Sequence, residues 1–378
     1  MLVFKEFENN EFSILDTEDN IIESISGEEL LNILCTTDIE IKGLSLNSKG
    51  FVVDDTKTVL YKPVKAKNSN LNKAKKAKND EFYTQLQDIE KELSHYPIET
   101  FKDKVIYCPC DSIDMSNGYI SNFAIYFYNN FEVLGIKKLI CTCYSDDINY
   151  FEYDGKTEIE DTIGSGDFRS EYCTKLLQEA DIVVTNPPFS LFRDFIKWLV
   201  TADKKFIIVG NQNAFTYKEV FPLIKDNKLW TGTGKSYSSL AGYFQSPYED
   251  RAVTGEHIEG QVRVSGVCWF TNVDHFHRHE KMTLLTMQDW KDTKGVEYPK
   301  YDNYDAIEVS KSNQIPSDYD GVIGVPISFL HKFSPDQFEI LGLDKDYTSD
   351  KSRFRINNKT LYARILIRHR KDENGKLI

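Results

Sequence analysis

The chain has 378 residues, of which 40% are hydrophobic and 28% are charged, and its formal net charge is −13. This length and composition fit a globular protein with a catalytic domain of a few hundred residues and a smaller module. Because no apolar run is long enough to span a membrane and no charged-then-apolar leader opens the chain, we expect a cytoplasmic protein.

The negative net charge is concentrated at the N-terminal end. Residues 1–60 hold 13 acidic residues and 4 lysines, whereas residues 61–78 hold 7 lysines and no acid. Residues 351–378 hold 9 lysines and arginines against 2 acids. Since local basic patches decide whether phosphates are bound, the overall charge does not exclude a nucleic-acid partner.

Residues 1–61 alternate apolar and polar positions around one helix-like piece, residues 27–34, which predicts a small β-rich accessory module. Nothing in this module resembles catalytic chemistry. The lysine-rich stretch 62–79 follows, and two interpretations of it stay open. It is either a solvated linker or a segment that contacts phosphates.

From residue 80 the pattern becomes a regular alternation of strands and helices, which predicts a catalytic domain over residues 80–275. Such alternation is typical of a parallel, doubly wound, Rossmann-like α/β sheet. A hairpin interrupts it at 149–160 and turns at Asp154-Gly155. The strands are expected at 105–108, 138–144, 181–185 and 206–209, and the helices at 121–131, 171–179, 191–200 and 217–225.

Beyond residue 230 the pattern weakens into a second, mixed region, which we assign to residues 276–378. Tyrosine-rich polar connections separate its apolar runs, and its basic residues gather toward the end. Further strands are expected at 266–271, 322–330, 338–343 and 360–368.

Each strand of the predicted sheet ends on polar residues, and the most informative of these ends is Asn186-Pro187-Pro188-Phe189. Two successive prolines give a rigid turn, and ligands of open α/β sheets bind at this edge. The Asn186 side-chain oxygen and the Pro187 carbonyl can accept hydrogen bonds from an exocyclic amine, which would aim its lone pair at a methyl donor. Phe189 would stack on the base.

Other ligand motifs are weak in this sequence. No G-x-G-x-x-G follows the first strand, where the chain reads Cys108-Pro109-Cys110-Asp111-Ser112, so a nicotinamide site is not indicated. Gly234-Lys235-Ser236 lacks the first glycine of a phosphate loop. The Cys-x-Cys pairs do not have the spacing of a zinc finger or ribbon, and His275-x-His277-x-His279 fits alternating polar residues in a loop. We therefore predict no metal.

Several ordered motifs resemble the EcoRI-type adenine-N6 DNA methyltransferases. They are Lys73 to Gln85 with its Asp-Glu-Phe-Tyr-Thr-Gln ending, Val105 to Asp111, Ser121-Asn122-Phe123, Lys137 to Tyr144, Gly166 to Ser170, Ala180 to Arg193, and Val209 to Ala214. The resemblance covers roughly residues 71–345. It implies S-adenosylmethionine as methyl donor and adenine in double-stranded DNA as acceptor. It also implies a Rossmann-like methyltransferase sheet, with residues 276–378 as the DNA target-recognition region.

The resemblance also implies roles for individual residues. The catalytic motif corresponds to Asn186, Pro187, Pro188 and Phe189, and the cofactor motifs to Phe82, Tyr83, Thr84, Asp111, Tyr144, Asp167 and Phe168. An adenine inside a duplex cannot reach such an edge, so it would be flipped out for direct methyl transfer. Candidates for phosphate contact are Lys73, Lys75, Lys76, Lys78, Arg353, Arg355, Arg364, Arg368 and Arg370.

Two alternatives stay open at this point. The first is a methyltransferase of another planar amine, such as RNA adenine or a protein glutamine. The second is a non-catalytic DNA-binding protein that retains the fold. A site-specific enzyme would belong to a restriction-modification system, with a cognate endonuclease acting on the same site, or would be an orphan or phage-borne modification enzyme.

Overall fold

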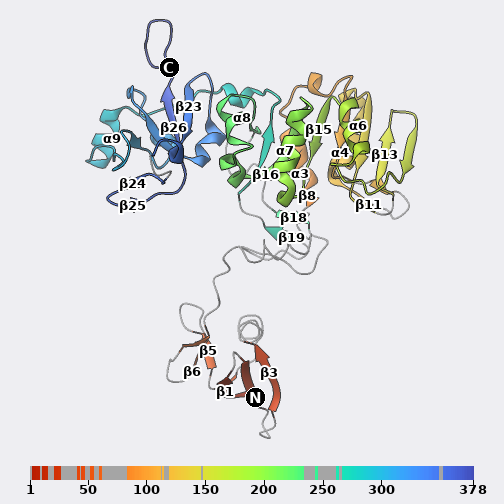
Figure 1. The fold of residues 1–378 in the computed structure, drawn as a ribbon, viewed down its shortest axis with the longest axis horizontal. Coiled ribbons are helices and arrows are strands. Elements are labelled where there is room, and N and C mark those ends of the chain that lie inside the picture. The colour runs from red at the N-terminus through yellow and green to blue at the C-terminus, as the bar shows by residue number, and fades with distance from the viewer. Residues whose placement is uncertain are drawn as a thin grey trace. The chain divides into compact units, whose positions relative to one another are not determined.

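The computed structural model describes residues 83–111, 113–114, 119–145, 148–233, 243–245, 261–263, 266–348 and 352–378, and seven short strands between residues 2 and 61. The chain divides into two compact units, Met1–Asn72 and Lys73–Ile378 (Figure 1). Among the described residues, no helix combines the length and the apolar character that crossing a membrane requires.

The first unit contains two small sheets. In one, the strand order is β3-β2-β1-β4, and in the other it is β5-β6-β7. The bounds are β1 Leu2–Glu8, β2 Glu11–Leu15, β3 Ile21–Ser26, β4 Ile41–Lys42, β5 Leu44–Leu46, β6 Val52–Asp54 and β7 Val59–Tyr61.

The second unit is built on an eight-stranded sheet with the order β14-β13-β12-β9-β15-β16-β20-β17. Its four central strands are parallel, namely β12 (Lys138–Thr142), β9 (Val105–Cys108), β15 (Ile182–Thr185) and β16 (Lys205–Asn211). Its outer strands are antiparallel, namely β13 (Tyr150–Tyr153), β14 (Glu158–Asp161), β20 (Val267–Thr271) and β17 (Trp230–Thr231).

The predicted strands and the hairpin at 149–160 are therefore confirmed, but the prediction of a parallel sheet holds only for its centre. The hairpin β13–β14 adds its strands next to β12 through a tight turn, which makes them antiparallel. At the other edge β20 runs against β16.

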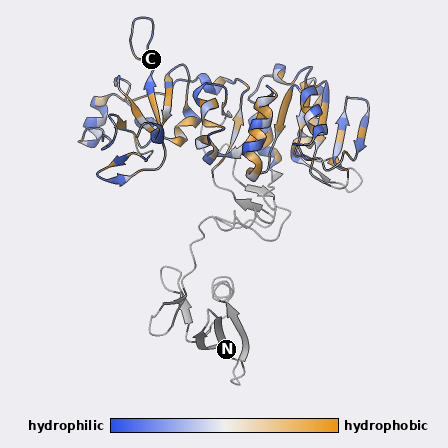
Figure 2. Cartoon of the chain, in the orientation of Figure 1, coloured by the Kyte–Doolittle hydropathy of each residue, from blue (hydrophilic) through white to orange (hydrophobic). Residues whose placement is uncertain are grey.

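Helices cover both faces of this sheet. Since successive strand residues point to opposite faces, each central strand contributes to two cores. Tyr107 and Val183 face a core shared with α6 (Glu171–Glu179) and α7 (Phe192–Thr201). Their neighbours Ile106 and Val184 face the other core, which includes residues of α3 (Leu86–Leu93), α4 (Asn122–Asn129) and α5 (Phe131–Leu134). Figure 2 shows apolar residues along the central strands and alternating with polar residues in the helices.

Two of these helices begin where the sequence supplies a capping serine. Ser121 Oγ accepts a hydrogen bond from the Ala124 amide at 3.4 Å, and Ser170 Oγ accepts one from the Cys173 amide at 3.1 Å. Helix α8 (Phe221–Lys225) is shorter than the predicted 217–225, and Pro222 stands in its first turn, where a missing N–H costs nothing.

The C-terminal part adds a second sheet with the order β21-β22-β26-β23. The predicted strand 322–330 ends early and gives way to a 3-10 helix at Ile327–Lys332, and the predicted strand 360–368 begins later. The bounds are β21 Ile307–Glu308, β22 Ile323–Pro326, β23 Phe338–Leu343 and β26 Arg364–His369, with a hairpin of β24 (Arg355–Ile356) and β25 (Lys359–Thr360) and a helix α9 (Met287–Lys294).

One continuous apolar core joins the two sheets. Phe215 and Phe270, from the large sheet and its following turn, lie in the same buried cluster as Phe329 and Ile367 of the C-terminal part. The boundary predicted at residue 276 is therefore not marked by a break in the core. Residues 276–378 complete the interior of the second unit and add a sheet beside it (Figure 1).

Candidate active site

The topology of the large sheet contains one switch point. From β9 the chain continues to β12 on one side, and it later returns to place β15 on the other side. Ligands of open α/β sheets bind in the crevice outside the carboxyl ends of such strands. Asp111 follows β9 and Asn186 follows β15, so both predicted residues lie at this edge.

Asp111 ties three strand ends together. Its amide donates to the Thr142 carbonyl at the end of β12 at 2.9 Å, and its Oδ2 accepts from the Thr185 hydroxyl at the end of β15 at 2.6 Å. The side chain is 5% exposed. Burial raises the pKa of this carboxyl to about 6, although hydrogen bonds from Thr185 and Ser121 act in the opposite direction. Asp111 thus joins the ends of β9, β12 and β15 at the switch point.

The Asn186-Pro187-Pro188-Phe189 turn leaves β15 at once. Pro188 has φ −54° and ψ 125°, and a 3-10 turn at Phe189–Leu191 leads directly into α7. Pro187 is buried, whereas Asn186 and Phe189 are half-buried. Phe189 packs against the core on the α3 and α4 side of the sheet. The turn is therefore fixed both by its prolines and by its neighbours.

The structure brings the Asn186 side chain to Thr84. Asn186 Nδ2 donates to Thr84 Oγ1 at 3.1 Å, across 102 positions of sequence. Thr84 belongs to β8 (Tyr83–Thr84), which pairs with β18 (Tyr243–Gln245), and β18 pairs in turn with β19 (Gln261–Arg263). The sequence motif that contains Thr84 and the catalytic motif therefore meet in one place.

The predicted Asp167-Phe168 pair lies on the turn before α6. Asp167 carries a two-point ion pair with Arg169, with N–O distances of 2.6 and 2.9 Å. Phe168 is 4% exposed and its ring meets those of Phe195 and Trp198 edge-on. The Phe168 ring is thus part of the core, and it anchors the turn that presents Asp167. Tyr144, which follows β12, is 62% exposed.

Gly166 allows this turn to lie against the end of β12. Its φ is +64°, and a Cβ at this position would lie 1.8 Å from the Cys143 carbonyl oxygen. Only glycine fits such a close backbone approach. The turn that carries Asp167 is therefore held beside the carboxyl end of β12.

The arginines predicted to contact phosphates fall into different environments. Arg364 is 9% exposed, and its guanidinium forms a buried ion pair with Glu308, with an Nη2–Oε1 distance of 2.7 Å. Its assignment to phosphate contact does not fit this geometry. Arg353 pairs with the buried carboxylate of Asp344 at 2.6 Å, whereas Arg368 and Arg370 are exposed.

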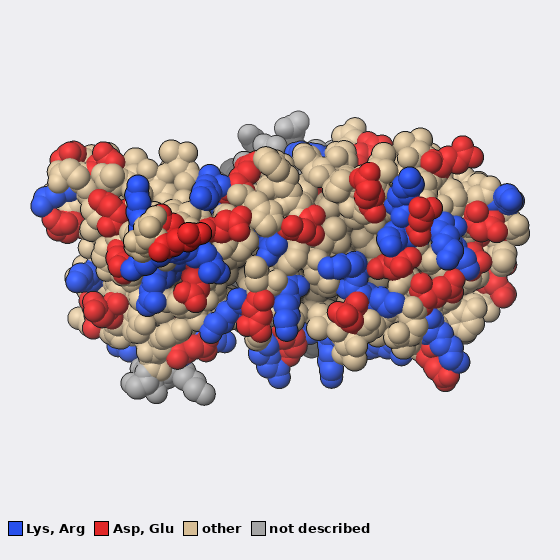
Figure 3. Space-filling view, turned by 90° about the horizontal axis from the view of Figure 1, so that it is seen from above, with Lys and Arg blue, Asp and Glu red and all other residues tan. Residues whose placement is uncertain are grey.

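Some predicted residues lie outside the part of the chain that the structure describes. These are Lys73, Lys75, Lys76, Lys78 and Phe82, and only the backbone of Tyr83 is described. On the face of the second unit seen from above in Figure 3, lysines and arginines are interspersed with acidic residues and with wide uncharged areas. Among the described residues drawn there, no large area of positive charge stands out.

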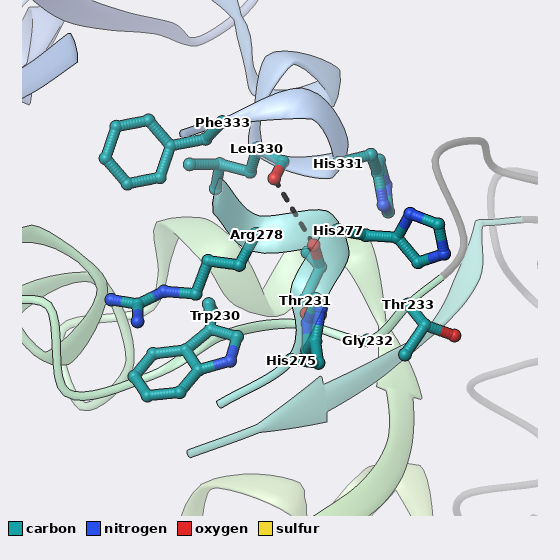
Figure 4. A pocket seen from close by; sticks show the side chains of 10 residues that line it. All are labelled: Trp230, Thr231, Gly232, Thr233, His275, His277, Arg278, Leu330, His331 and Phe333. Carbon is teal, nitrogen blue, oxygen red and sulfur yellow. Dashed lines mark hydrogen bonds between the residues drawn. The ribbon is translucent and has the colours of Figure 1, made fainter. Parts of the chain in front are cut away.

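Residues His275, His277 and Arg278 line one part of a small cavity at the β17 edge, and residues 230–233, 330, 331 and 333 line the rest (Figure 4). The cavity of about 10 Å³ has roughly the room for one water molecule. His275 Nε2 lies 2.9 Å from the Thr231 carbonyl oxygen, and Arg278 stacks over Trp230 at 3.7 Å. Because β20 and β16 separate β17 from β15, this cavity lies away from Asn186.

Metal-binding geometry is not found among the described residues, where no group of three or more histidine, cysteine, aspartate or glutamate side chains could hold an ion. None of the described cysteines forms a disulfide.

Sequence reasoning missed the Thr84–Asn186 contact and the buried carboxylate of Glu92. Glu92 accepts hydrogen bonds from the Thr233 amide at 2.7 Å and from the Tyr96 hydroxyl at 3.1 Å. The signal in the sequence for a buried Glu92 was an acidic residue on the apolar face of an amphipathic helix. Glu92 fixes the start of the segment between β17 and β18 to α3.

Known proteins are similar to this chain over the part that contains the candidate site. A family described as "Adenine-specific methyltransferase EcoRI" matches residues 70–376. The type II methyltransferase M.EcoRI of Escherichia coli is 44% identical over 331 residues, which cover 81% of this chain and 98% of that protein. The type II methyltransferase M.MpnI of Mycoplasma pneumoniae is 40% identical and covers 71% of this chain and 84% of its own length. No solved structure matches the chain.

We expect Gly166→Ala to destabilise the protein by on the order of 2–4 kcal/mol, because it combines a left-handed φ with a backbone clash. Gly164→Ala is the matched control, since Gly164 has φ +62° and nothing within 4 Å of an added Cβ. Urea unfolding of both variants measures the difference. Equal losses for the two glycines would contradict the close approach at Cys143.

The pKa of Asp111 predicts a pH dependence of stability. Its folded pKa of about 6 lies above its value in the unfolded chain, so its contribution is fully present below about pH 4 and is lost as pH rises to 6. The loss is on the order of 2–3 kcal/mol. Asp111→Asn should remove this fall, as measured by urea unfolding across the pH range.

An opposite-sign control is Asp154→Asn in the β13–β14 turn. Backbone hydrogen bonds from Thr157 and Lys156 hold the pKa of the exposed Asp154 carboxyl below its usual range. Its contribution is therefore present at neutral pH and is lost as pH falls. If the stability of the wild type and that of Asp111→Asn changed with pH in parallel, Asp111 would not titrate in this way.

Proposed function

Because the chain belongs to the family described as adenine-specific methyltransferase EcoRI, we propose that it transfers a methyl group from S-adenosylmethionine to the N6 amine of an adenine in double-stranded DNA. The observation that carries this proposal is the Asn186 carboxamide, held at the sheet's switch point at the start of a proline-stiffened turn. A fixed acceptor at this place, beside the Pro187 carbonyl, suits the methylation of a planar amine.

The reaction needs the amine to become a better nucleophile. The N6 lone pair is delocalised into the ring, and hydrogen bonds from its two N–H groups to Asn186 Oδ1 and the Pro187 carbonyl favour a pyramidal nitrogen. The rigid turn keeps both acceptors in place. Phe189 stacks on the base and sets the plane in which it lies. Transfer would form the N–C bond as the S–C bond of the donor breaks, and the methylated nitrogen, now an acidic ammonium, would lose its proton to water. No side chain therefore needs to act as a strong base in this step.

The residues around the crevice fit the methyl donor. S-adenosylmethionine supplies an activated methyl group on a sulfonium centre. Asp167 offers a carboxylate beside the end of β12, on a turn that Gly166 brings close to the backbone. Tyr144 lies at the same strand end, and Asp111 joins the strand ends at the switch point. Phe82 and Tyr83 of the upstream motif complete the proposed cofactor site.

DNA is the proposed partner, and a base inside a duplex must be flipped out to reach the crevice. The exposed Arg368 and Arg370, with Arg353, Arg355 and the lysines of residues 73–78, are the proposed phosphate contacts. We place target recognition in residues 276–378. Type II methyltransferases are the relatives of this chain, so a role in restriction-modification with a cognate endonuclease is part of the proposal.

Asn186→Ala should lower the rate of methylation of duplex DNA about a hundredfold or more, because one of two amine acceptors is removed. Labelled methyl transfer from S-adenosylmethionine to duplex DNA, single-stranded RNA and protein, with detection of N6-methyladenine, measures it. Methyl transfer by the wild-type chain to RNA or protein alone would support a methyltransferase of another planar amine. If Asn186→Ala methylated duplex DNA at an unchanged rate, Asn186 would not be a catalytic residue.

Arg368→Gln should weaken DNA binding about equally for all sequences and reduce the slope of log affinity against log salt by about 1. Lys175→Gln is the control, because Lys175 is exposed on α6 and pairs there with Glu171. Arg364→Met should lower thermal stability instead, since Arg364 serves a buried ion pair. Salt-dependent binding measurements separate the two effects, and an unchanged slope for Arg368→Gln would contradict phosphate contact.

A further inference from the structure

We propose that Thr84 is a positioning residue for the catalytic amide of Asn186, a role distinct from cofactor binding. This inference rests on the proposed function. Thr84 is 2% exposed, and its Oγ1 receives the Asn186 Nδ2 hydrogen at 3.1 Å. A buried hydroxyl therefore fixes the amino end of the carboxamide that carries the acceptor oxygen.

Thr84 can serve this role because three neighbours fix its own backbone. Asn122, the first residue of α4, donates from Nδ2 to the Thr84 carbonyl at 2.7 Å. β18 pairs with β8 so that Phe244 lies opposite Thr84. The following residue, Gln85, caps α3, and its carbonyl accepts from the Asp88 and Ile89 amides at 3.1 and 3.2 Å. The hydroxyl is thus presented from a rigid position.

The chemistry of an amide explains why this matters. A carboxamide has an accepting oxygen at one end and two N–H donors at the other. With Nδ2 turned toward Thr84, Oδ1 points to the other side, as an amine with two N–H donors requires. If the Asn186 carboxamide were rotated by half a turn, its N–H donors would face the N–H donors of the substrate amine. The Thr84 hydroxyl also fixes the plane of the amide, which sets the angle at which the amine is held.

The position of Thr84 in the sequence hides this role. It is the last residue of the Phe82-Tyr83-Thr84 motif, whose resemblance implies cofactor contact. The structure directs its hydroxyl toward the catalytic turn, so one short motif serves both substrates. A positioning role predicts a loss in the rate of methyl transfer, whereas a cofactor role predicts a loss in S-adenosylmethionine affinity.

The test compares Thr84→Val, which keeps the shape and removes the acceptor, with Thr84→Ser, which keeps the hydroxyl. Single-turnover rates, kcat and KM for S-adenosylmethionine and for duplex DNA are measured. Thr84→Val should lower the single-turnover rate roughly 10- to 100-fold with KM for S-adenosylmethionine nearly unchanged. Thr84→Ser should recover most of the rate. Asn122→Ala should lower the same rate by a smaller factor.

Thr271→Val is the matched control for loss of a buried hydroxyl. Thr271 is fully buried on β20, where its Oγ1 donates to the Phe206 carbonyl at 2.8 Å away from the crevice. It should change stability and leave the single-turnover rate of the folded protein unaltered. If Thr84→Val does not fold, Thr84→Ser and Asn122→Ala still test the inference, because both keep a hydroxyl at position 84.

Three results would overturn the positioning role. They are an unchanged rate and an unchanged KM in Thr84→Val, a raised KM for S-adenosylmethionine with an unchanged single-turnover rate, and an equal rate loss in Thr271→Val. Failure of the proposed function gives a different result, since the wild-type chain itself would then not methylate duplex DNA.

Discussion

The hydrogen bond between the Thr185 hydroxyl and the Asp111 carboxylate is the contact on which the site depends. It joins the ends of β15 and β9, the two strands that flank the switch point of the sheet. Neither strand end could move without breaking a buried charge-assisted bond, which is among the stronger contacts in proteins. The proline turn leaves from this fixed point. The prolines make the turn rigid, and this hydrogen bond fixes the end of β15 from which the turn starts. Both are needed to hold Asn186 in one position.

A second constraint comes from the continuous core. The C-terminal sheet faces the same apolar cluster as α6 and α7, so the part of the chain assigned to target recognition is packed directly onto the catalytic sheet. Its own charged residues divide accordingly. Arg364 lies inward and neutralises Glu308, while Arg368, four positions along the same strand, is exposed. One strand thus serves both the interior and the surface.

Much of this arrangement could be predicted from the sequence, and the exceptions have physical causes. Short β-branched runs such as Asp181 to Thr185 identified the central strands, because burial on both faces demands continuous apolar character. Strand direction at the edges did not follow, since it depends on pairing across long separations. The Thr84–Asn186 contact joins residues 102 positions apart. Charge alone also did not separate buried Arg364 from exposed Arg368.

The shared core has a consequence for how such proteins can diverge. Residues 276–378 cannot be exchanged as a cassette, because the cut would expose the apolar surfaces around Phe270 and Phe329 to water. New surfaces in this part of the chain must therefore arise by substitution on surface loops, or by transfer of a larger segment that brings its matching interior. Evolution of the C-terminal surface is thus coupled to the packing of the large sheet.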